Sequence, residues 1–202
     1  MTDDDVAFAE AELSRKDRDL GRLIQAHGHL NRLRPAPYFR NLARSIVGQQ
    51  ISVKAAASIY GRLEAATDLD PHKVVTLSVD ELRGFGLSRS KATYVRDLAE
   101  HFVNDGAVYD HLGELADDLV IAELIQVKGI GVWTAHMFLM FTLGRPDVFA
   151  PDDVGLQRAM VGLYGLKAVP AKADLVEMAE RWRPYRTVAC WHLWHSLDNA
   201  PV

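Results

Sequence analysis

Apolar side chains recur every three or four positions along most of the chain, the spacing that places them on one face of an α-helix. The clearest sets are Phe39, Leu42 and Ile46; Ala55, Ile59 and Leu63; Tyr94, Leu98 and Phe102; and Leu175, Met178 and Trp182. No alternation of apolar and polar residues is long enough to indicate a strand. The pattern therefore predicts an all-α protein of roughly ten helices.

Segments rich in Pro, Gly and Asp separate the expected helices, at residues 34–37, 68–71, 84–86, 128–131, 144–153 and 167–172. No low-complexity linker divides the chain, so any two lobes must pack closely. A weak internal echo relates "ELRGFGLSRSKATYVRDL" to "ELIQVKGIGVWTAHMFLM". Both set a short helix, a Gly-x-Gly turn and a longer helix in order, which is a common arrangement.

Composition excludes several classes of protein. Hydrophobic residues make up 49% of the 202 residues and charged residues 25%, which is ordinary for a globular chain. The longest apolar run, "HMFLMFTLG", is too short to cross a bilayer, and the acidic start is unlike a signal peptide. We therefore expect a cytoplasmic protein. The net charge of -4 argues against a protein that coats nucleic acid without specificity.

Two short motifs carry candidate chemistry. Gly129 and Gly131 flank Ile130 in a turn whose following helix would point unpaired N–H groups at an anion such as a phosphate. For an isolated Gly-x-Gly, a plain helix-helix turn is the alternative. Pro151 followed by Asp152 and Asp153 predicts a helix start, where aspartate is favoured as the N-cap. Capping alone would explain one of the two carboxylates.

Three segments in order resemble the helix-hairpin-helix DNA glycosylase superfamily, and within it the 3-methyladenine DNA glycosylase II branch. They are "KGIGVWTA" with "DVFAPDD", "SIVGQQISVKAAASIYGRL" at 45–63, and "RWRPYRTVACWHLWH" at 181–195. The resemblance spans roughly 40–197 and matches a short form without the N-terminal β-rich domain of larger members. It implies a two-lobed helical fold with the active-site cleft between the lobes. One lobe would comprise 28–145, with the hairpin at about 118–143, and the other 1–27 plus 146–202.

The resemblance assigns catalysis to Asp153 and binding of the flipped base to Trp133 and Trp194. Met137 stands where the family has a tyrosine, and His136 is a candidate contact to the base. A carboxylate suits this chemistry, because cleavage of an N-glycosidic bond builds positive charge on the deoxyribose. An electron-rich indole attracts a cationic alkylpurine.

The resemblance also implies how DNA is held. Gln50, assisted by Gln49, would fill the gap left by the extruded nucleotide. The hairpin residues Gly129, Gly131, Lys128 and Thr134 would contact the DNA backbone. A monovalent cation, sodium or potassium, would bind the main-chain carbonyls of Ile125, Val127 and Gly129. No other cofactor is expected.

The resulting hypothesis is a monofunctional glycosylase of base excision repair that hydrolyses alkylated purines, 3-methyladenine first, from double-stranded DNA. Bifunctional members carry a lysine nucleophile in the place of Trp133, and the single cysteine, Cys190, excludes an iron-sulfur cluster. We expect a monomer that acts at the bacterial nucleoid and does not bind a membrane. The principal alternative is a non-catalytic protein that recognises bent or branched DNA on the same scaffold. A helical protein-interaction module would leave both motifs unexplained.

Overall fold

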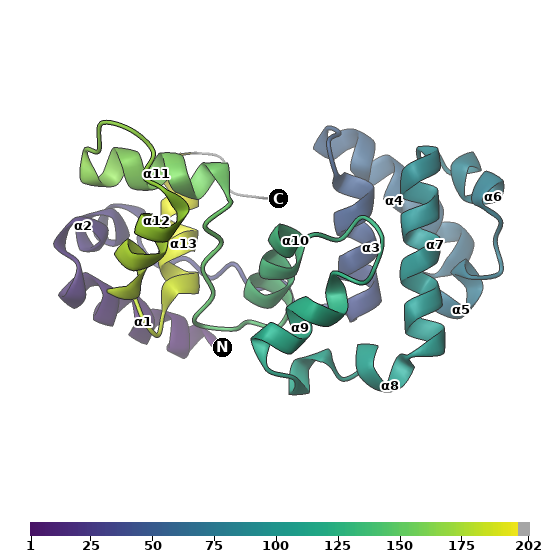
Figure 1. The fold of residues 1–202 in the computed structure, drawn as a ribbon, viewed down its shortest axis with the longest axis horizontal. Helices are drawn as coiled ribbons and strands as arrows, with labels where there is room; N and C mark the ends of the chain where they lie inside the picture. Colours follow the sequence, from purple (N-terminus) through teal and green to yellow (C-terminus); the bar gives the residue numbers. More distant parts are fainter. Residues whose placement is uncertain (198–202) are drawn as a thin grey trace. The chain divides into compact units, whose positions relative to one another are not determined.

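The computed structural model describes residues 1–197, and every regular element in that range is helical (Figure 1). The expectation of an all-α fold is confirmed. Thirteen α-helices lie in the described range, together with a 3₁₀ turn and a π-helical segment. The number exceeds the expected ten partly because α5 (Pro71–Val74) and α8 (Gly106–Tyr109) are single turns, too short to show a period. None of the helices in this range is long and apolar enough to cross a membrane.

The chain forms two compact units, one from residues 1–34 with the chain from 139 onward, the other from residues 35–138. These borders differ from the expected ones at 27/28 and 145/146. The reason for the first shift lies in the hydrogen bonds of residues 28–34, which join the first unit. The N–H of Leu30 donates to Glu10 Oε1 at 2.9 Å, and that of Arg34 donates to the Phe141 carbonyl at 2.8 Å.

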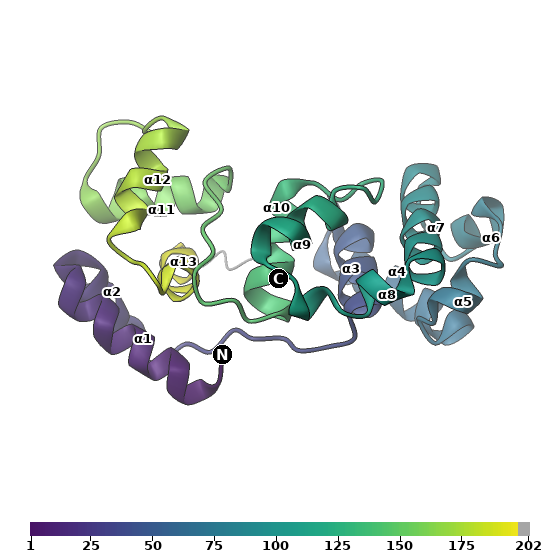
Figure 2. The same cartoon turned by 60° about the horizontal axis from the view of Figure 1, so that its bottom comes forward.

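The first unit is built around α13 (Arg186–His195), whose residues from Thr187 to Trp194 are all buried. Its partners are α1 (Asp3–Lys16), α2 (Arg18–His27), α11 (Val154–Tyr164) and α12 (Lys172–Glu180). Figure 2 shows α13 between the α1–α2 pair and the α11–α12 pair. A helix that is buried all round must come from an apolar sequence, and α13 reads "RTVACWHLWH".

A polar network, buried at Glu10, Asp17 and His192, joins the two chain ends inside this unit. His192 Nε2 lies 3.0 Å from Glu10 Oε1, and His29 Nδ1 lies 2.8 Å from Glu10 Oε2. Burial lowers the pKa of His192 to about 4, because it disfavours the imidazolium more than Glu10 stabilises it. Asp17, the N-cap of α2, accepts bonds from the Tyr164 hydroxyl and the Trp182 indole. The bonds to Asp17 connect the α1–α2 pair to residues 147 and 165 positions later.

The second unit surrounds α7 (Arg89–Asn104), which packs against α3 (Tyr38–Gly48), α5, α6 (Val79–Gly84) and α8. The remaining helices are α4 (Val53–Thr67), α9 (Asp117–Leu124) and α10 (Val132–Met137). Its core includes a chain of aromatic rings, in which the ring centroids of Phe39 and Phe102 are 5.3 Å apart and those of Phe102 and Tyr109 5.0 Å apart. These contacts fix the ends of α3 and α7 against each other.

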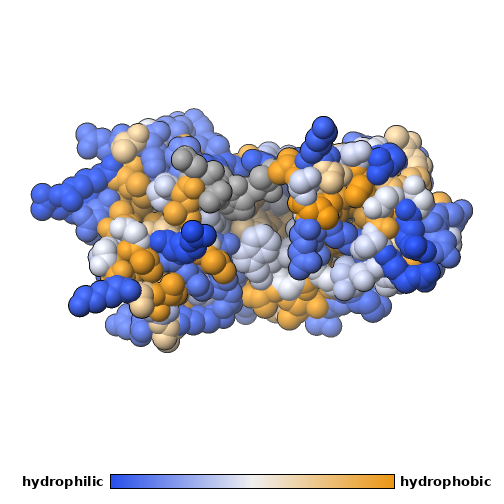
Figure 3. Space-filling view, turned by 90° about the horizontal axis from the view of Figure 1, so that it is seen from above, coloured by the Kyte–Doolittle hydropathy of each residue, from blue (hydrophilic) through white to orange (hydrophobic). Residues whose placement is uncertain are grey.

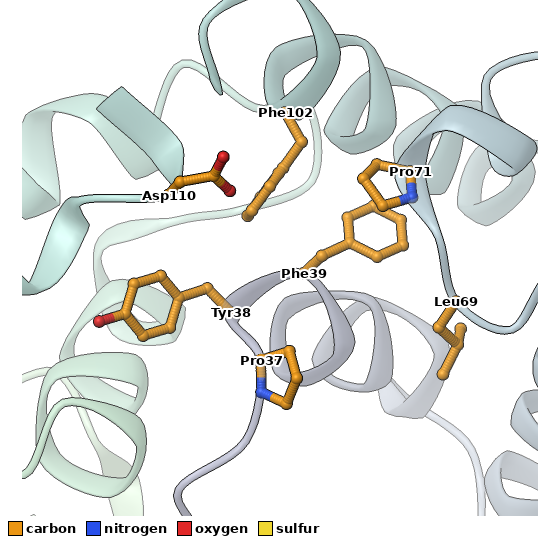
Figure 4. A pocket seen from close by; sticks show the side chains of 7 residues that line it. All are labelled: Pro37, Tyr38, Phe39, Leu69, Pro71, Phe102 and Asp110. Atoms are coloured by element: carbon orange, nitrogen blue, oxygen red, sulfur yellow. The ribbon is translucent and has the colours of Figure 1, made fainter. Parts of the chain in front are cut away.

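An open surface pocket of about 380 Å³ lies beside this aromatic chain (Figure 4). The side chains of Phe39 and Phe102 face it, with Tyr38 and Asp110 at its edge. None of the residues expected to carry chemistry lines this pocket. It is therefore not part of the candidate functional site.

Candidate active site

Asp153 is the N-cap of α11, and its Oδ1 is held by two donors. Its Oδ1 accepts a hydrogen bond from the Leu156 main-chain N–H at 2.7 Å and another from Trp194 Nε1 at 2.8 Å. The side chain is buried, with 8% of the residue exposed. The two interpretations of the Pro-Asp-Asp motif, cap and candidate acid, therefore fall on the same residue. A carboxylate held by two donors keeps one orientation, as a charge-stabilising group requires.

The neighbouring Asp152 has a different environment. Its Oδ2 lies 2.5 Å from Lys172 Nζ, and both side chains are more than half exposed. An exposed ion pair contributes little to stability and is screened by salt. Asp152 is therefore a natural control for Asp153.

Gly155 makes the approach of Trp194 to Asp153 possible. A methyl group added at Gly155 would lie 3.0 Å from Asp153 Oδ1 and 3.2 Å from Trp194 Cδ1. Any larger residue would therefore press against both partners of the hydrogen bond. Sequence reasoning did not identify Gly155, because its importance depends on a side chain 39 positions away.

Trp194 is almost fully buried, and its ring packs with Phe141 at 5.7 Å between centroids. Its indole N–H is directed at the candidate acid. The prediction that Trp194 also binds a flipped base stays a prediction. What the structure adds is a role in orienting Asp153, which the spacing of the sequence did not indicate.

The hairpin lies in the second unit between α9 and α10, and α10 continues as a π-helical segment, Phe138–Thr142. Gly129 adopts a φ of +83°, and an added methyl group there would fall 2.2 Å from the Tyr94 ring. Both conformation and space therefore require glycine at 129. Gly131 is the N-cap of α10 and has open space around it. Ile130 is buried, as expected for a side chain that staples the two helices.

Lys128 is held by a buried carboxylate from α7. Its main-chain N–H donates to Asp97 Oδ2 at 2.8 Å and its Nζ to Asp97 Oδ1 at 2.5 Å. Burial opposes ionisation of Asp97, but the bonds from Lys128 outweigh it and lower the pKa of this carboxyl. The Lys128 side chain remains half exposed, so contact with a DNA phosphate stays a prediction. Thr134 is buried, which does not favour its predicted contact with the DNA backbone.

Exposed apolar side chains flank the hairpin and the turn after α3. They are Ile51, Val53, Ile125, Val132 and Trp133. Figure 3 shows apolar surface interrupted by hydrophilic side chains over the unit that contains α3, α4 and α7, on the right of the view. Trp133 is 41% exposed, an uncommon state for a tryptophan. His136 and Met137, which follow on α10, are half-buried.

Gln49 and Gln50 differ in conformation and in bonding. Gln50 is exposed and adopts a φ of +56°, a left-handed conformation that is rare outside glycine. The side-chain amide of Gln49 donates to the Gly129 carbonyl at 2.9 Å. Gln49 therefore connects the turn after α3 to the hairpin and is less suited than Gln50 to enter DNA.

The carbonyls predicted to bind a cation are partly engaged by the protein. The Val127 carbonyl accepts from the Ile130 N–H at 3.1 Å, and the Gly129 carbonyl accepts from Gln49. Each carbonyl has a second lone pair, so these bonds are compatible with an ion. Within residues 1–197 no group of three His, Cys, Asp or Glu side chains could hold a metal. The cation site stays a prediction.

Residues 43–184 match the HhH-GPD superfamily of base excision DNA repair proteins. The chain is 30% identical to DNA-3-methyladenine glycosylase 1 of Schizosaccharomyces pombe over 202 residues, covering 95% of this chain and 88% of that protein. A crystal structure of DNA-3-methyladenine glycosidase from Bacillus halodurans superposes with a TM-score of 0.83 and 38% identity over 93% of this chain and 88% of that one. The structure of a 3-methyladenine DNA glycosylase of S. pombe in complex with abasic DNA superposes with a TM-score of 0.78 and 29% identity. The match covers 95% of this chain and 97% of that one.

Proposed function

The chain belongs to the HhH-GPD superfamily of base excision DNA repair proteins, and from this premise we propose that it is a monofunctional glycosylase for alkylated purines. Its first substrate would be 3-methyladenine in double-stranded DNA, and its product an abasic site. The observation that carries the proposal is the anchored carboxylate of Asp153, bonded by the Leu156 N–H and the Trp194 indole.

Hydrolysis of the N-glycosidic bond requires one well-placed carboxylate. As the N-glycosidic bond lengthens, positive charge develops on the deoxyribose, and the negative charge of Asp153 stabilises it and orients the attacking water. A purine alkylated at N3 or N7 is already cationic and leaves without protonation. A strong general acid is therefore unnecessary. This agrees with a site in which the bonds to Oδ1 hold Asp153 in place.

Trp133 supports two parts of the proposal. Its exposed indole can stack on a cationic base, an attraction of about 1–2 kcal/mol when water is excluded. It also stands where a lysine would provide a nucleophile for strand cleavage, so hydrolysis is the expected reaction. His136 and Met137 would complete the contacts to the base from the same helix.

DNA would be held by the second unit. Gly129 and Gly131 let the backbone approach a phosphate closely, and Lys128 adds a positive charge. Gln50, exposed at the tip of the turn after α3, would fill the space of the extruded nucleotide. We propose that the protein acts as a monomer and that catalysis needs no dissociable cofactor beyond a structural sodium or potassium ion.

The test is the release of free 3-methyladenine from methylated duplex DNA, measured by chromatography. We expect release by the wild-type protein and abasic sites in the product, with no strand cleavage until alkali or heat is applied. A chelator of divalent metals should not reduce the rate. The absence of free base, or efficient cleavage of the strand at abasic sites by the protein itself, would overturn the proposal.

A second measurement tests recognition by charge. The variant Trp133→Leu should lose more activity on cationic 3-methyladenine than on neutral hypoxanthine, if the wild type excises both. The expected difference is about 5- to 30-fold, which corresponds to about 1–2 kcal/mol. Equal losses on the two bases would refute a cation–π role for this residue.

A further inference from the structure

The turn between α3 and α4, residues 49–52, contains a backbone conformation that needs support. Gln50 has a φ of +56°, a left-handed conformation that is strained for a non-glycine residue and persists only where the surroundings impose it. The chain continues into Ser52, whose hydroxyl caps α4 by accepting from the Ala55 N–H at 3.3 Å. The question is what holds the other end of the turn.

Lys91, from the first turn of α7, holds that end. Its Nζ donates to the Val47 carbonyl at 2.7 Å and to the Gln49 carbonyl. These carbonyls lie at the C-terminal end of α3, where main-chain oxygens lack helical partners and the helix dipole attracts a cation. The Lys91 side chain is half-buried, and burial lowers the pKa of its ammonium group. The partly buried ammonium is bonded to two uncharged main-chain oxygens and not to a carboxylate. Its bonds therefore hold the backbone at Val47 and Gln49 in place.

A second bond fixes the same segment from another direction. The Gln49 amide reaches the Gly129 carbonyl of the hairpin, whose conformation is set by the packing of Gly129 on Tyr94. The backbone of Gln49 is thus tied to α7 and its side chain to the hairpin. Gln50 follows directly and is exposed. The two bonds determine where its side chain is presented.

We propose that Lys91 is a positioning residue that, together with Gln49, holds the turn after α3 so that Gln50 is directed into the DNA stack. The inference rests on the proposed glycosylase function, and it names a residue that acts through another and touches neither the sugar nor the base. Without the ammonium, the carbonyls of Val47 and Gln49 lose their donor and the left-handed turn at Gln50 relaxes. The free-energy cost of extruding a paired base then rises.

The experiment compares two substrates under single-turnover conditions. In one, 3-methyladenine lies opposite thymine; in the other, the same strand faces an abasic-site analogue, so extrusion breaks no base pair. The variant Lys91→Met should lose about tenfold more rate on the paired substrate than on the unpaired one, the size of effect that a displacement of about 1 Å can cause. Lys91→Arg, which can donate to both carbonyls, should recover most of that loss.

Controls separate the outcomes. Lys54→Met removes an exposed charge from α4 in the same unit and should change the two rates by the same factor. In a Gln50→Ala background, Lys91→Met should add little further loss on the paired substrate, because the residue through which it acts is already gone. If Lys91→Met does not fold, Gln49→Leu carries the same prediction by removing the bond to Gly129.

Equal losses on the two substrates, no loss on either, or full additivity with Gln50→Ala would overturn the inference. These results leave the proposed function standing, because wild-type release of 3-methyladenine is measured in the same series. No release by the wild type would instead refute the proposed function itself.

Discussion

Replacing Asp153 with asparagine should remove the charge of the site while keeping its geometry. Both described bonds to the carboxylate end on Oδ1, from the Leu156 N–H and from Trp194 Nε1. The carbonyl oxygen of an asparagine can accept both of these bonds. We therefore expect the free energy of unfolding to change by less than about 1 kcal/mol. The helix cap is retained, since asparagine caps about as well as aspartate.

The rate should fall much further. A full charge on the sugar about 4 Å from the carboxylate interacts with it by about 4 kcal/mol at an effective dielectric constant of about 20. Because each 1.36 kcal/mol corresponds to a tenfold change in rate, and because the transition state carries less than a full charge, we expect a loss between about 10²- and 10³-fold.

The assay is single-turnover release of 3-methyladenine, together with the affinity for abasic DNA and urea unfolding. Asp153→Asn should retain stability and DNA binding. Asp152→Asn is the matched control: it breaks only an exposed ion pair with Lys172 and should leave the rate within about threefold. The reasoning is refuted if Asp153→Asn keeps more than a tenth of the wild-type rate, or if the two variants behave alike.

Three further predictions follow from other contacts. Gly155→Ala places a methyl group 3.0 Å from Asp153 Oδ1 and 3.2 Å from Trp194 Cδ1, so it should slow base release about tenfold or more; unchanged release would contradict this prediction. Asp97→Ala should lower the free energy of unfolding in urea by about 2–3 kcal/mol, because the N–H of Lys128 loses a buried acceptor; a change below about 0.5 kcal/mol would count against this. The folded-state pKa of His192 lies below its ordinary value, at about 4, so its stabilising contribution is complete above pH 6.5 and is lost as the pH falls towards 4. Between pH 7 and pH 5 this amounts to about 2 kcal/mol, and His192→Gln should show a correspondingly smaller fall; equal pH dependences would show that His192 does not titrate in this way.

Helices were predictable from the sequence because each of the longer ones buries one face, and burial imposes a period. The single-turn helices α5 and α8 bury too few residues to do so. The expected border at 27/28 differs from the contact border at 34/35, because residues 28–34 are attached by polar bonds rather than by an apolar stripe. Leu30 donates to Glu10 through its backbone, and no side-chain pattern records such a bond.

The candidate site was predictable in part for the same reason. Proline followed by two aspartates is a local signal, and Asp153 is the cap that this signal indicates. Gly155, Asp97 and Lys91 act on residues 31 to 44 positions away in the sequence, so their roles exist only once the chain has folded. Of these three residues, Asp97 gives the clearest signal once the helix is known. It is a carboxylate on a helix of 16 residues and yet is buried, which requires a partner such as Lys128.

The discontinuous first unit has a consequence for the order in which the protein becomes active during synthesis. The hairpin and the turn after α3 belong to one uninterrupted segment, residues 35–138, which leaves the ribosome early. One of the bonds that orient the candidate acid forms only when α13 supplies Trp194, 41 positions after Asp153. A nascent chain or a fragment that ends before α13 contains the segment proposed to bind DNA but lacks the bond from Trp194 to Asp153. Incomplete copies should therefore bind DNA without breaking glycosidic bonds in it.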